Sequence, residues 1–206
     1  MPKIGLVPHA EALHHIEGLV GGWYDTGLTE RGRRQARQAG ETLARLFPCI
    51  DVQVVSSDLR RAAQTAEIIA QVLGSSVAVD RRLRELSYGI AEGRPKAWLT
   101  QRLCVPSDAE AQLDHRVCEG AESRRDLASR VYAAMDALLD GNGIYHVVVT
   151  HGFAATFAIA HWIGLPIGHA ARVDFVTPPA SITLLSEDPL FQSRRVLQLG
   201  DTRHLS

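Results

Sequence analysis

The stretch Ile4-Gly5-Leu6-Val7-Pro8-His9-Ala10-Glu11 opens the chain with an apolar run that ends in a histidine. Its apolar residues follow one another without polar alternation, which is typical of a strand buried on both faces of a sheet. Similar short runs recur and predict further strands, the last of them at an edge, at residues 51–55, 76–79, 146–149, 181–185 and 195–199. The pattern indicates a central sheet that is covered on both sides.

Segments of helical periodicity separate these strands. They cover residues 29–47, 59–73, 127–138 and 152–163. Thr29 and Asp58 are the expected N-caps of the first two helices. Gly74 is expected to end the second helix, and Gly141-Asn142-Gly143 the third. Strands that alternate with helices predict an α/β fold, a three-layer α/β/α sandwich with a mainly parallel central sheet.

The length of the chain suits a single domain. It has 206 residues, of which 46% are apolar and 22% charged, as in an ordinary globular protein. We therefore expect residues 1–206 to form one domain. Residues 89–121 show weak periodicity, and we expect them to form an irregular or short-helical insertion that covers the active site.

Composition and charge exclude several classes of function. The formal net charge of −1 gives no basis for binding nucleic acid. No apolar run approaches the ~18 residues that a membrane span needs, so we expect a cytoplasmic protein without a membrane partner. Cys49, Cys104 and Cys118 form no CxxC pair, and no HExxH motif is present, so we expect neither a metal nor a cofactor. The oligomeric state stays open between monomer and homodimer.

Four titratable or charged groups follow the ends of predicted strands: His9, Arg61, Glu85 and His151. The carboxyl ends of parallel strands meet at one edge of an open sheet, so these groups can converge on one pocket. Together they suit phosphoryl transfer through a covalent intermediate. A neutral imidazole attacks phosphorus, cations hold the phosphoryl oxygens, and a carboxylic acid protonates the leaving oxygen.

At these positions the sequence resembles the histidine phosphatase superfamily, in particular its phosphatase branch related to phosphoglycerate mutase. The shared motifs follow the family's order along nearly the whole chain. They are Pro8-His9-Ala10-Glu11, Leu28-Thr29-Glu30-Arg31-Gly32-Arg33-Arg34-Gln35-Ala36, residues 56–66, Leu83-Arg84-Glu85 with Gly89 and Glu92-Gly93, Gly120-Ala121-Glu122-Ser123, and Val149-Thr150-His151-Gly152. The resemblance implies a phosphatase that hydrolyses a small phosphomonoester through a phosphohistidine intermediate.

The resemblance also implies a role for each matching residue. His9 would be the phosphorylated nucleophile, and Arg61 would bind the phosphoryl oxygens. Glu85 would be the general acid and then the base that activates water. His151 would stabilise the transferring group as a second imidazole, with the backbone N–H of Gly152 close by. The implied partner is a small phosphorylated substrate, and no cofactor is implied.

Two positions depart from the family pattern. Pro8 stands where the family has an arginine, and losing such a contact to phosphate costs roughly 10²–10³ in rate. His15 stands where the family usually has an asparagine that touches phosphate. We expect His15 to bind substrate as a hydrogen-bond donor, with added positive charge if the ring is protonated. His14 and His15 also fit a surface loop.

Three interpretations of Pro8 stay open. The chain is an active phosphatase with a rearranged pocket, or a weakened or inactive relative that binds a phosphorylated ligand or a partner protein. In the third interpretation, Pro8 is a sequence-level change in an otherwise ordinary enzyme. A phosphoglycerate-type mutase is less favoured, because the chain is short and Glu85-Leu86-Ser87-Tyr88-Gly89 resembles the phosphatase form of the acid segment.

Overall fold

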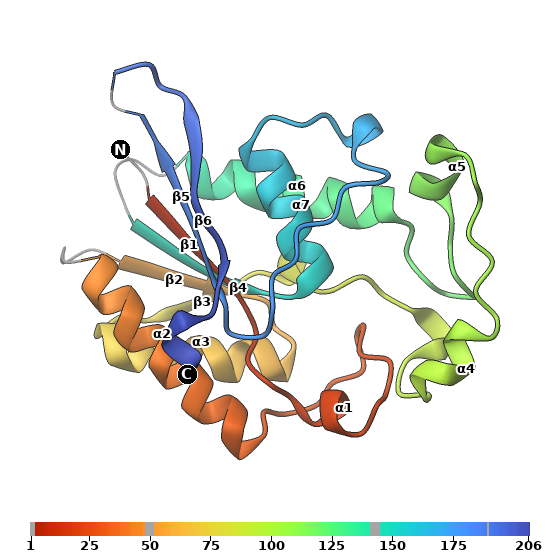
Figure 1. Ribbon diagram of the computed structural model, residues 1–206, viewed down its shortest axis with the longest axis horizontal. Helices are drawn as coiled ribbons and strands as arrows, with labels where there is room; N and C mark the ends of the chain where they lie inside the picture. The colour runs from red at the N-terminus through yellow and green to blue at the C-terminus, as the bar shows by residue number, and fades with distance from the viewer. Residues whose placement is uncertain (1–2, 48–51, 141–144, 189) are drawn as a thin grey trace.

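A sheet of six strands runs through the part of the molecule that the structure describes (Figure 1). This computed structural model describes residues 3–47, 52–140, 145–188 and 190–206. The strands are β1 (Lys3–Pro8), β2 (Val52–Ser56), β3 (Val77–Val79), β4 (Tyr145–Thr150), β5 (Ile182–Glu187) and β6 (Arg194–Asp201). Each corresponds to a predicted strand, although Asp51, the first residue predicted for β2, lies outside the described residues.

The order of strands in the sheet is β3-β2-β4-β1-β5-β6. β3, β2, β4 and β1 pair in parallel, whereas β5 pairs antiparallel with both β1 and β6. Among the described strands, β5 alone therefore runs against the others, and the predicted mainly parallel sheet is confirmed. This order places the carboxyl ends of β1, β2 and β4 side by side, at the edge where such sheets bind ligands.

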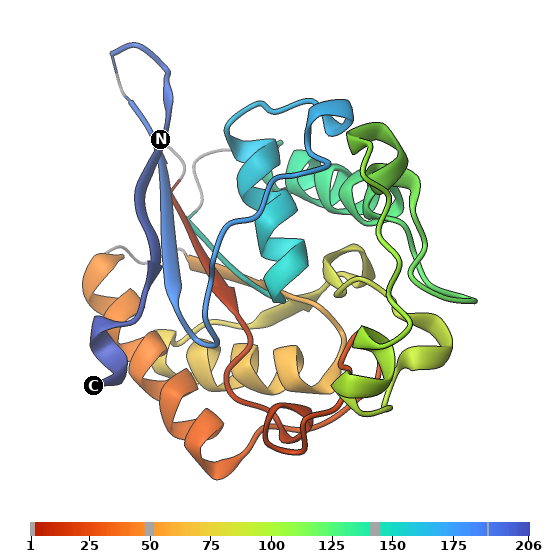
Figure 2. The same ribbon diagram turned by 45° about the vertical axis from the view of Figure 1, so that its right-hand side comes forward.

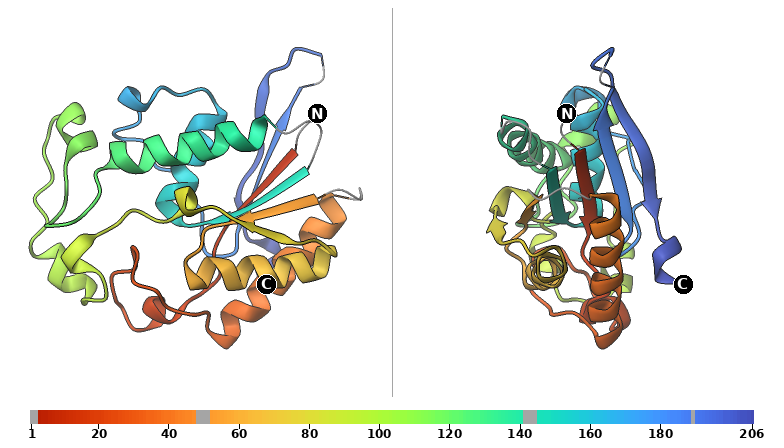
Figure 3. Two further views of the ribbon diagram at one scale, coloured as in Figure 1. Left: turned by 180° about the vertical axis from the view of Figure 1, so that it is seen from behind. Right: turned by 90° about the vertical axis from the view of Figure 1, so that its left-hand side faces the viewer.

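Helices cover both faces of the sheet (Figures 2 and 3). One face carries α2 (Glu30–Leu46) and α3 (Arg60–Leu73), and the other carries α6 (Arg124–Leu139) and α7 (Gly152–Trp162). Successive residues of β1 serve the two sides, because Leu6 belongs to the apolar cluster under α6 and α7 and Val7 to the cluster under α2 and α3. The predicted three-layer α/β/α sandwich is confirmed.

The predicted helix caps are only partly correct. Thr29 caps α2, since its side chain accepts a hydrogen bond from the backbone N–H of Gly32. Gly74 ends α3 in the left-handed conformation, with φ of +66°. The prediction that Asp58 caps α3 is wrong, because the N-cap is Leu59 and makes no side-chain bond. The Asp58 carboxylate instead pairs with the guanidinium of Arg84, which offers two charged hydrogen bonds of 2.6 Å.

Residues 89–121 contain short helical pieces joined by irregular chain, as predicted. They are η2 (Gly89–Ala91), α4 (Lys96–Thr100) and α5 (Ala109–Asp114). The other short helices are α1 (Leu13–Ile16), η1 (Arg81–Leu83), η3 (Ile167–His169) and η4 (Arg203–Leu205). α4 lies beside the loop that follows α1, and the Lys96 N–H donates to the Gly18 carbonyl at 2.9 Å (Figure 1).

The helices in the described part of the chain are modest in length. α2 has 17 residues and α6 has 16. No described helix is both long enough and apolar enough to cross a membrane. The segment 141–143, predicted to end α6, lies outside the described residues, and the last described residue of that helix is Leu139.

Candidate functional site

Three strand ends converge on one buried place. β1 leads into His9, whose backbone N–H donates to the Thr150 carbonyl at 2.7 Å. β2 leads into Ser57, whose N–H donates to the Val149 carbonyl at 3.0 Å. The rings of His9 and His151 consequently lie edge to face, with their centroids 5.1 Å apart. The structure thus brings the two histidines predicted for the site together.

His9 is buried, and both of its ring nitrogens have partners. Nδ1 lies 2.8 Å from the Ala10 carbonyl, and Nε2 lies 3.1 Å from Nε of Arg61. A carbonyl can only accept and a guanidinium can only donate, so we assign the ring proton to Nδ1 and the lone pair to Nε2. Burial first, and then the charge of Arg61, hold the pKa of His9 well below its usual value. His9 is therefore a neutral imidazole whose Nε2 lone pair faces a cation.

Arg61 is a cation with almost no exposure to solvent. Its Nη1 donates to the Tyr24 carbonyl at 2.9 Å, and its Nη2 donates to the Gly22 carbonyl at 2.5 Å. Burial lowers the pKa of this guanidinium, and the carboxylates of Glu85 and others oppose the shift. All three of its hydrogen-bond acceptors are uncharged, so Arg61 keeps a positive charge beside His9 that an incoming anion can neutralise.

His151 offers an unused donor beside His9. The Ser57 hydroxyl oxygen lies 2.9 Å from His151 Nε2 and accepts the backbone N–H of Leu59 at 3.3 Å. When the hydroxyl donates its own proton to Nε2, the ring proton of His151 is on Nδ1. Nδ1 is buried without a hydrogen-bond partner in the described part of the chain. An unpaired buried N–H is costly, and a phosphoryl oxygen would satisfy it.

Glu85 lies at the N-terminus of α7. Its Oε1 accepts the Leu86 N–H at 2.9 Å, and its Oε2 accepts the Phe153 N–H at 3.3 Å. Burial raises the pKa of this carboxyl above its usual value, although those two hydrogen bonds and Arg61 act in the opposite direction. A raised pKa keeps a share of Glu85 protonated closer to neutral pH, which a general acid requires. Gly152, the first residue of α7, lies beside the same carboxylate and lines the cavity described below.

Two side chains hold the backbone of Glu85, and sequence reasoning missed one of them, Arg130. Arg130 Nη2 and Trp23 Nε1 each donate to the Glu85 carbonyl at 2.7 Å. Arg130 Nη1 also donates to the Arg84 carbonyl at 2.5 Å. Nothing local in the sequence separates Arg130 from the other arginines of α6, because its partners come from a segment more than 40 residues earlier.

His14 and His15 follow His9 closely in space. The surface-loop interpretation is wrong for His14, which is buried and bonds Thr26 Oγ1 through Nδ1 at 2.9 Å. His15 stacks on His9 with ring centroids 5.2 Å apart. Burial, above all, lowers the pKa of His14 to about 3 and that of His15 to about 4. Both rings are neutral at pH 7, so His15 does not replace the charge of the missing arginine.

The tautomer of His15 suits a donor. Its Nδ1 accepts the Ala12 N–H at 3.3 Å, so the ring proton is on Nε2. His9, His14 and His15 are also the described group whose ligand atoms, all within 4.8 Å of one another, could hold a metal ion. Ligation through His9 Nε2 would displace the Arg61 N–H and put a divalent cation beside a fixed guanidinium. The arrangement therefore fits an anion better than a metal.

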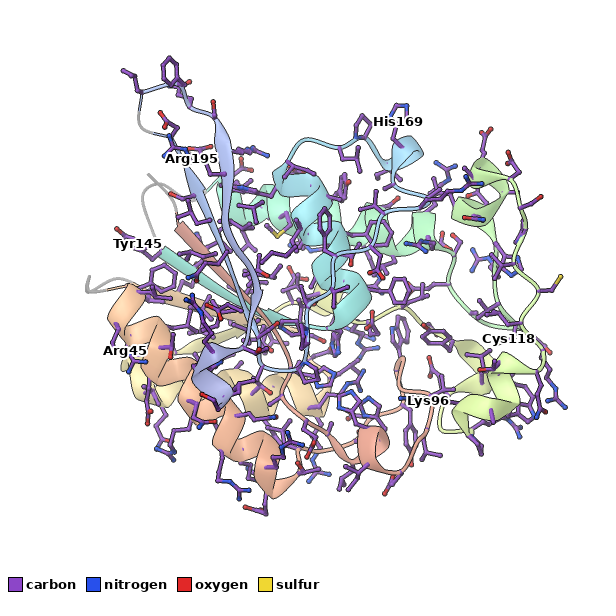
Figure 4. All side chains as sticks on the ribbon, in the orientation of Figure 1. Arg45, Lys96, Cys118, Tyr145, His169 and Arg195 are labelled. Atoms are coloured by element: carbon purple, nitrogen blue, oxygen red, sulfur yellow. The ribbon has the colours of Figure 1, made fainter. Side chains whose placement is uncertain are left out.

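A cavity of about 430 Å³ opens above these residues, and we call it the strand-end cavity. Pro8, His9, His15, Arg61, Glu85 and Gly152 lie on its wall, together with residues of α4. Lys96, labelled in Figure 4, and Arg61 are the described Lys and Arg residues that line it. The predicted site residues except His151 thus border one space, and His151 lies directly behind His9.

Pro8 fits the sheet without loss of a hydrogen bond. The N–H of His9 points to β4, so an N–H at position 8 would point to the β5 side. The pairing of β1 with β5 ends at Leu6 and Thr183, before that position is reached. The Pro8 carbonyl accepts the Ala180 N–H at 2.9 Å. The backbone therefore tolerates proline here, and what the chain lacks is the arginine side chain.

Comparison with known proteins identifies the family. The model of the histidine phosphatase superfamily (branch 1) matches residues 4–198. The chain belongs to this superfamily. The motifs that suggested the resemblance therefore lie in a true family member, and the fold has the family's mixed α/β architecture.

Relatives of this superfamily member carry two kinds of name. The "probable phosphoglycerate mutase GpmB" of Salmonella paratyphi C is 32% identical over 213 residues, which cover 100% of this chain and 95% of the relative. Among solved structures, Bacillus stearothermophilus YhfR has 25% identity and a TM-score of 0.81, with complete coverage of both chains. A mycobacterial glucosyl-3-phosphoglycerate phosphatase, solved with VO3, has 28% identity and a TM-score of 0.78, covering 97% of this chain and 99% of its own.

Proposed function

We propose that this chain is a phosphatase that hydrolyses small phosphomonoesters through a phosphohistidine intermediate on Nε2 of His9. The observation that carries the proposal is a neutral imidazole lone pair held 3.1 Å from the buried cation Arg61 on the wall of the strand-end cavity. Transfer of a phosphoryl group needs both a nucleophile and a positive site for its oxygens. The structural relatives that carry phosphatase names support this choice.

The first step forms the bond between Nε2 of His9 and phosphorus and breaks the ester P–O bond. As Nε2 uses its lone pair, the Nε–H of Arg61 is released and donates to a phosphoryl oxygen instead. The bond from Nδ1–H to the Ala10 carbonyl stabilises the positive charge that the ring acquires. Protonated Glu85 gives its proton to the leaving oxygen, which departs as an alcohol.

The second step returns the enzyme to its starting state. Water attacks phosphorus, the N–P bond breaks, and the Glu85 carboxylate takes the water proton. The unpaired Nδ1–H of His151, the Nε2–H of His15 and the N–H of Gly152 are donors for the phosphoryl oxygens. Inorganic phosphate leaves, and His9 is again neutral with its proton on Nδ1.

The competing proposal is a protein that binds a phosphorylated ligand or a partner with little turnover. Pro8 favours it, because one guanidinium that would hold the phosphoryl group is missing. A phosphoglycerate-type mutase is a further candidate, supported by the name of the 32% identical relatives. All three share the same anion pocket and differ in what happens to the phosphoryl group.

Turnover and covalent trapping separate these candidates. The chain, Pro8→Arg and His9→Ala are assayed with p-nitrophenyl phosphate, and each is quenched in alkali with labelled substrate to detect phosphohistidine. His169→Ala is the matched control, since His169 is exposed and far from the strand ends (Figure 4). We expect turnover and label in the chain and in the control, and neither in His9→Ala.

Three other outcomes would contradict the phosphatase proposal or its nucleophile. Turnover that survives His9→Ala would overturn the nucleophile assignment. Binding of phosphate without turnover, followed by turnover in Pro8→Arg, would support the binding protein. Transfer of label to a second position of phosphoglycerate, in preference to water, would support a mutase.

A further inference from the structure

A second cavity of about 240 Å³ lies under the insertion, next to the strand-end cavity. Its wall is mainly apolar and is formed in part by Leu86, Leu103, Val105, Val117 and Phe153. Tyr88 and Leu99 line both cavities, so the two spaces adjoin at these side chains. A cavity of ~150 Å³ is enough for a benzene-sized ligand. The second cavity therefore has room for a substituted ring or a branched aliphatic group.

Arg124 places a cation on this mainly apolar wall. Its Nη2 donates to the Val173 carbonyl at 2.7 Å, and its guanidinium carbon lies 5.2 Å from the centre of the Phe153 ring. Its Nε is buried and has no hydrogen-bond partner in the described part of the chain. Among the described residues Arg124 forms no ion pair within 4.0 Å, although the Asp174 carboxylate acts on the pKa of its guanidinium from farther away. Its neighbour Arg125 pairs with Asp114 at 2.6 Å. The charge of Arg124 is thus available to a ligand.

A second unsatisfied group lies on the same wall. His115 Nε2 is buried and also lacks a partner among the described residues. The one carboxylate of the wall with which these groups could pair belongs to Glu122, and Arg130 already binds it at 2.9 and 2.7 Å. Two buried polar atoms without partners are unusual beside an apolar cavity, because each costs as much as a lost hydrogen bond. A bound acceptor would satisfy the Nε–H of Arg124, and also His115 in the tautomer that carries its proton on Nε2.

We infer that the second cavity binds the alcohol part of the substrate, and that this part is a ring-sized apolar group carrying a carboxylate or carbonyl that bonds Arg124. The inference rests on the proposed phosphatase function, because it places the phosphoryl group at His9 and the rest of the same molecule past Tyr88. Tyr88 follows the proposed acid Glu85 by three residues and lines both cavities. The group that protonates the leaving oxygen and the entrance to the second cavity therefore belong to one segment of the chain. The apolar wall is the reason for proposing a ring, and the guanidinium without an ion pair is the reason for proposing a hydrogen-bond acceptor on that ring.

Three substrates test the inference with matched variants. Glycerol 2-phosphate lacks the ring, phenyl phosphate has the ring alone, and 3- or 4-carboxyphenyl phosphate has both features. We expect kcat/KM to rise in that order. In Arg124→Met the advantage of the carboxyphenyl over the phenyl ester should fall about 10- to 100-fold, the range for a lost hydrogen bond to a charged group. Arg125→Met, one position along α6, should keep the advantage.

A second variant separates loss of the cavity from loss of the cation. Val105→Trp fills the second cavity from an exposed position, so the protein should fold normally. It should lower kcat/KM for both ring esters and leave glycerol 2-phosphate within about twofold, as expected for a surface change away from the chemistry. Acetylphenyl phosphate carries a neutral carbonyl in place of the carboxylate. Its kcat/KM, compared with that of the carboxyphenyl ester, shows whether Arg124 binds a neutral acceptor as well as a charged one.

Failure of the inference and failure of the phosphatase proposal give different results. Turnover of all esters with no preference for the ring, or a preference that Arg124→Met leaves unchanged, would overturn the inference alone. For a chain without turnover, calorimetry with carboxyphenyl and phenyl phosphonates replaces kinetics. A carboxyl preference in binding that Arg124→Met abolishes would then support the second cavity, and its absence would overturn it.

Discussion

The strand-end cavity and the second cavity adjoin, yet they are built in different ways. His9 and Arg61 are buried, and each bonds partners far away in the sequence. The second cavity lies under residues 89–121, and its wall includes Leu103 and Val105, which are 43% and 54% exposed. The first is made by the sheet itself, whereas the second depends on a segment of short helices. The difference suggests that the reaction and the choice of substrate can change independently.

The strongest test of the strand-end cavity is the loss of its buried cation. Arg61→Met should lower kcat/KM for p-nitrophenyl phosphate by about 10³-fold or more, because the phosphoryl oxygens lose a preorganised charge. The Met side chain keeps the length of the original, but the Gly22 and Tyr24 carbonyls lose their donor, so the fold of the variant is checked by circular dichroism. Arg60→Met, an exposed neighbour, is the control and should change kcat/KM little. Similar losses in both variants would place the effect outside the pocket.

The acid assigned to Glu85 predicts a dependence on pH and on the leaving group. Activity needs neutral His9 and protonated Glu85. Since the pKa of His9 is lowered and that of Glu85 is raised, kcat/KM should fall as pH drops through the first value and also as pH rises through the second. Glu85→Gln should cost about 10²–10⁴-fold with an alkyl phosphate, whose leaving oxygen needs the proton. The loss should be much smaller with p-nitrophenyl phosphate.

The role of Glu85 as general acid can be contradicted by the same variant. If Glu85→Gln slows both esters to the same extent and leaves the alkaline fall in place, the carboxyl has another role. Glu41→Gln is a useful control, because this carboxyl is exposed on α2 and lines neither cavity.

A close contact behind His9 predicts a smaller effect on stability. The helix α2 approaches the loop that follows β1 so tightly that a Cβ on Gly32 would lie 2.0 Å from the Glu11 carbonyl oxygen. Gly32→Ala should therefore lower the free energy of unfolding by about 1–3 kcal/mol, measured in urea. Gly168→Ala is the control, since a Cβ there meets nothing within 4 Å. Equal stability of the two variants would show that α2 moves aside without cost.

A substitution in residues 89–121 should affect turnover least for a substrate that does not contact this segment. Trp98 lies between the guanidinium groups of Arg94 and Arg102, at 4.9 and 4.4 Å. Trp98→Ala removes these contacts, and we expect a loss of about 0.5–1 kcal/mol per contact in stability at most. Steady-state kinetics with p-nitrophenyl phosphate should change less than about twofold, as for a surface change away from the site. A large fall in kcat would mean that the insertion shapes the reaction itself.

The sequence predicts the sheet and the groups at its strand ends because both depend on local patterns. The apolar run before His9 is buried on both faces, and the motifs put His9, Arg61, Glu85 and His151 near one edge. The cap assigned to Asp58 fails because Arg84, 26 residues later, competes for the carboxylate. The burial of His14 and the bonds of Arg130 to the Glu85 segment likewise depend on partners that no local window contains.

Some roles remain predictions because they concern states with substrate bound. His15 has the tautomer of a donor and lies on the wall of the strand-end cavity, but its contact to phosphate is a proposal. The number of subunits and the cellular location also stay predictions. For Pro8, the structure explains why the backbone accepts proline. The effect of Pro8 on turnover is measured by comparing the chain with Pro8→Arg.

The long-range bonds of the site also have a consequence for folding. His9 bonds Arg61 across 52 positions, Leu83 bonds Thr150 across 67, and Ser57 bonds His151 across 94. A fragment shorter than residues 9–151 cannot contain all three pairs. Each pair forms only after a long loop of the chain has closed, which costs entropy. Recovery of phosphate binding during refolding should therefore coincide with completion of the whole sheet. Phosphate bound at the proposed site would stabilise only the complete fold, so a substrate would also favour correctly folded molecules.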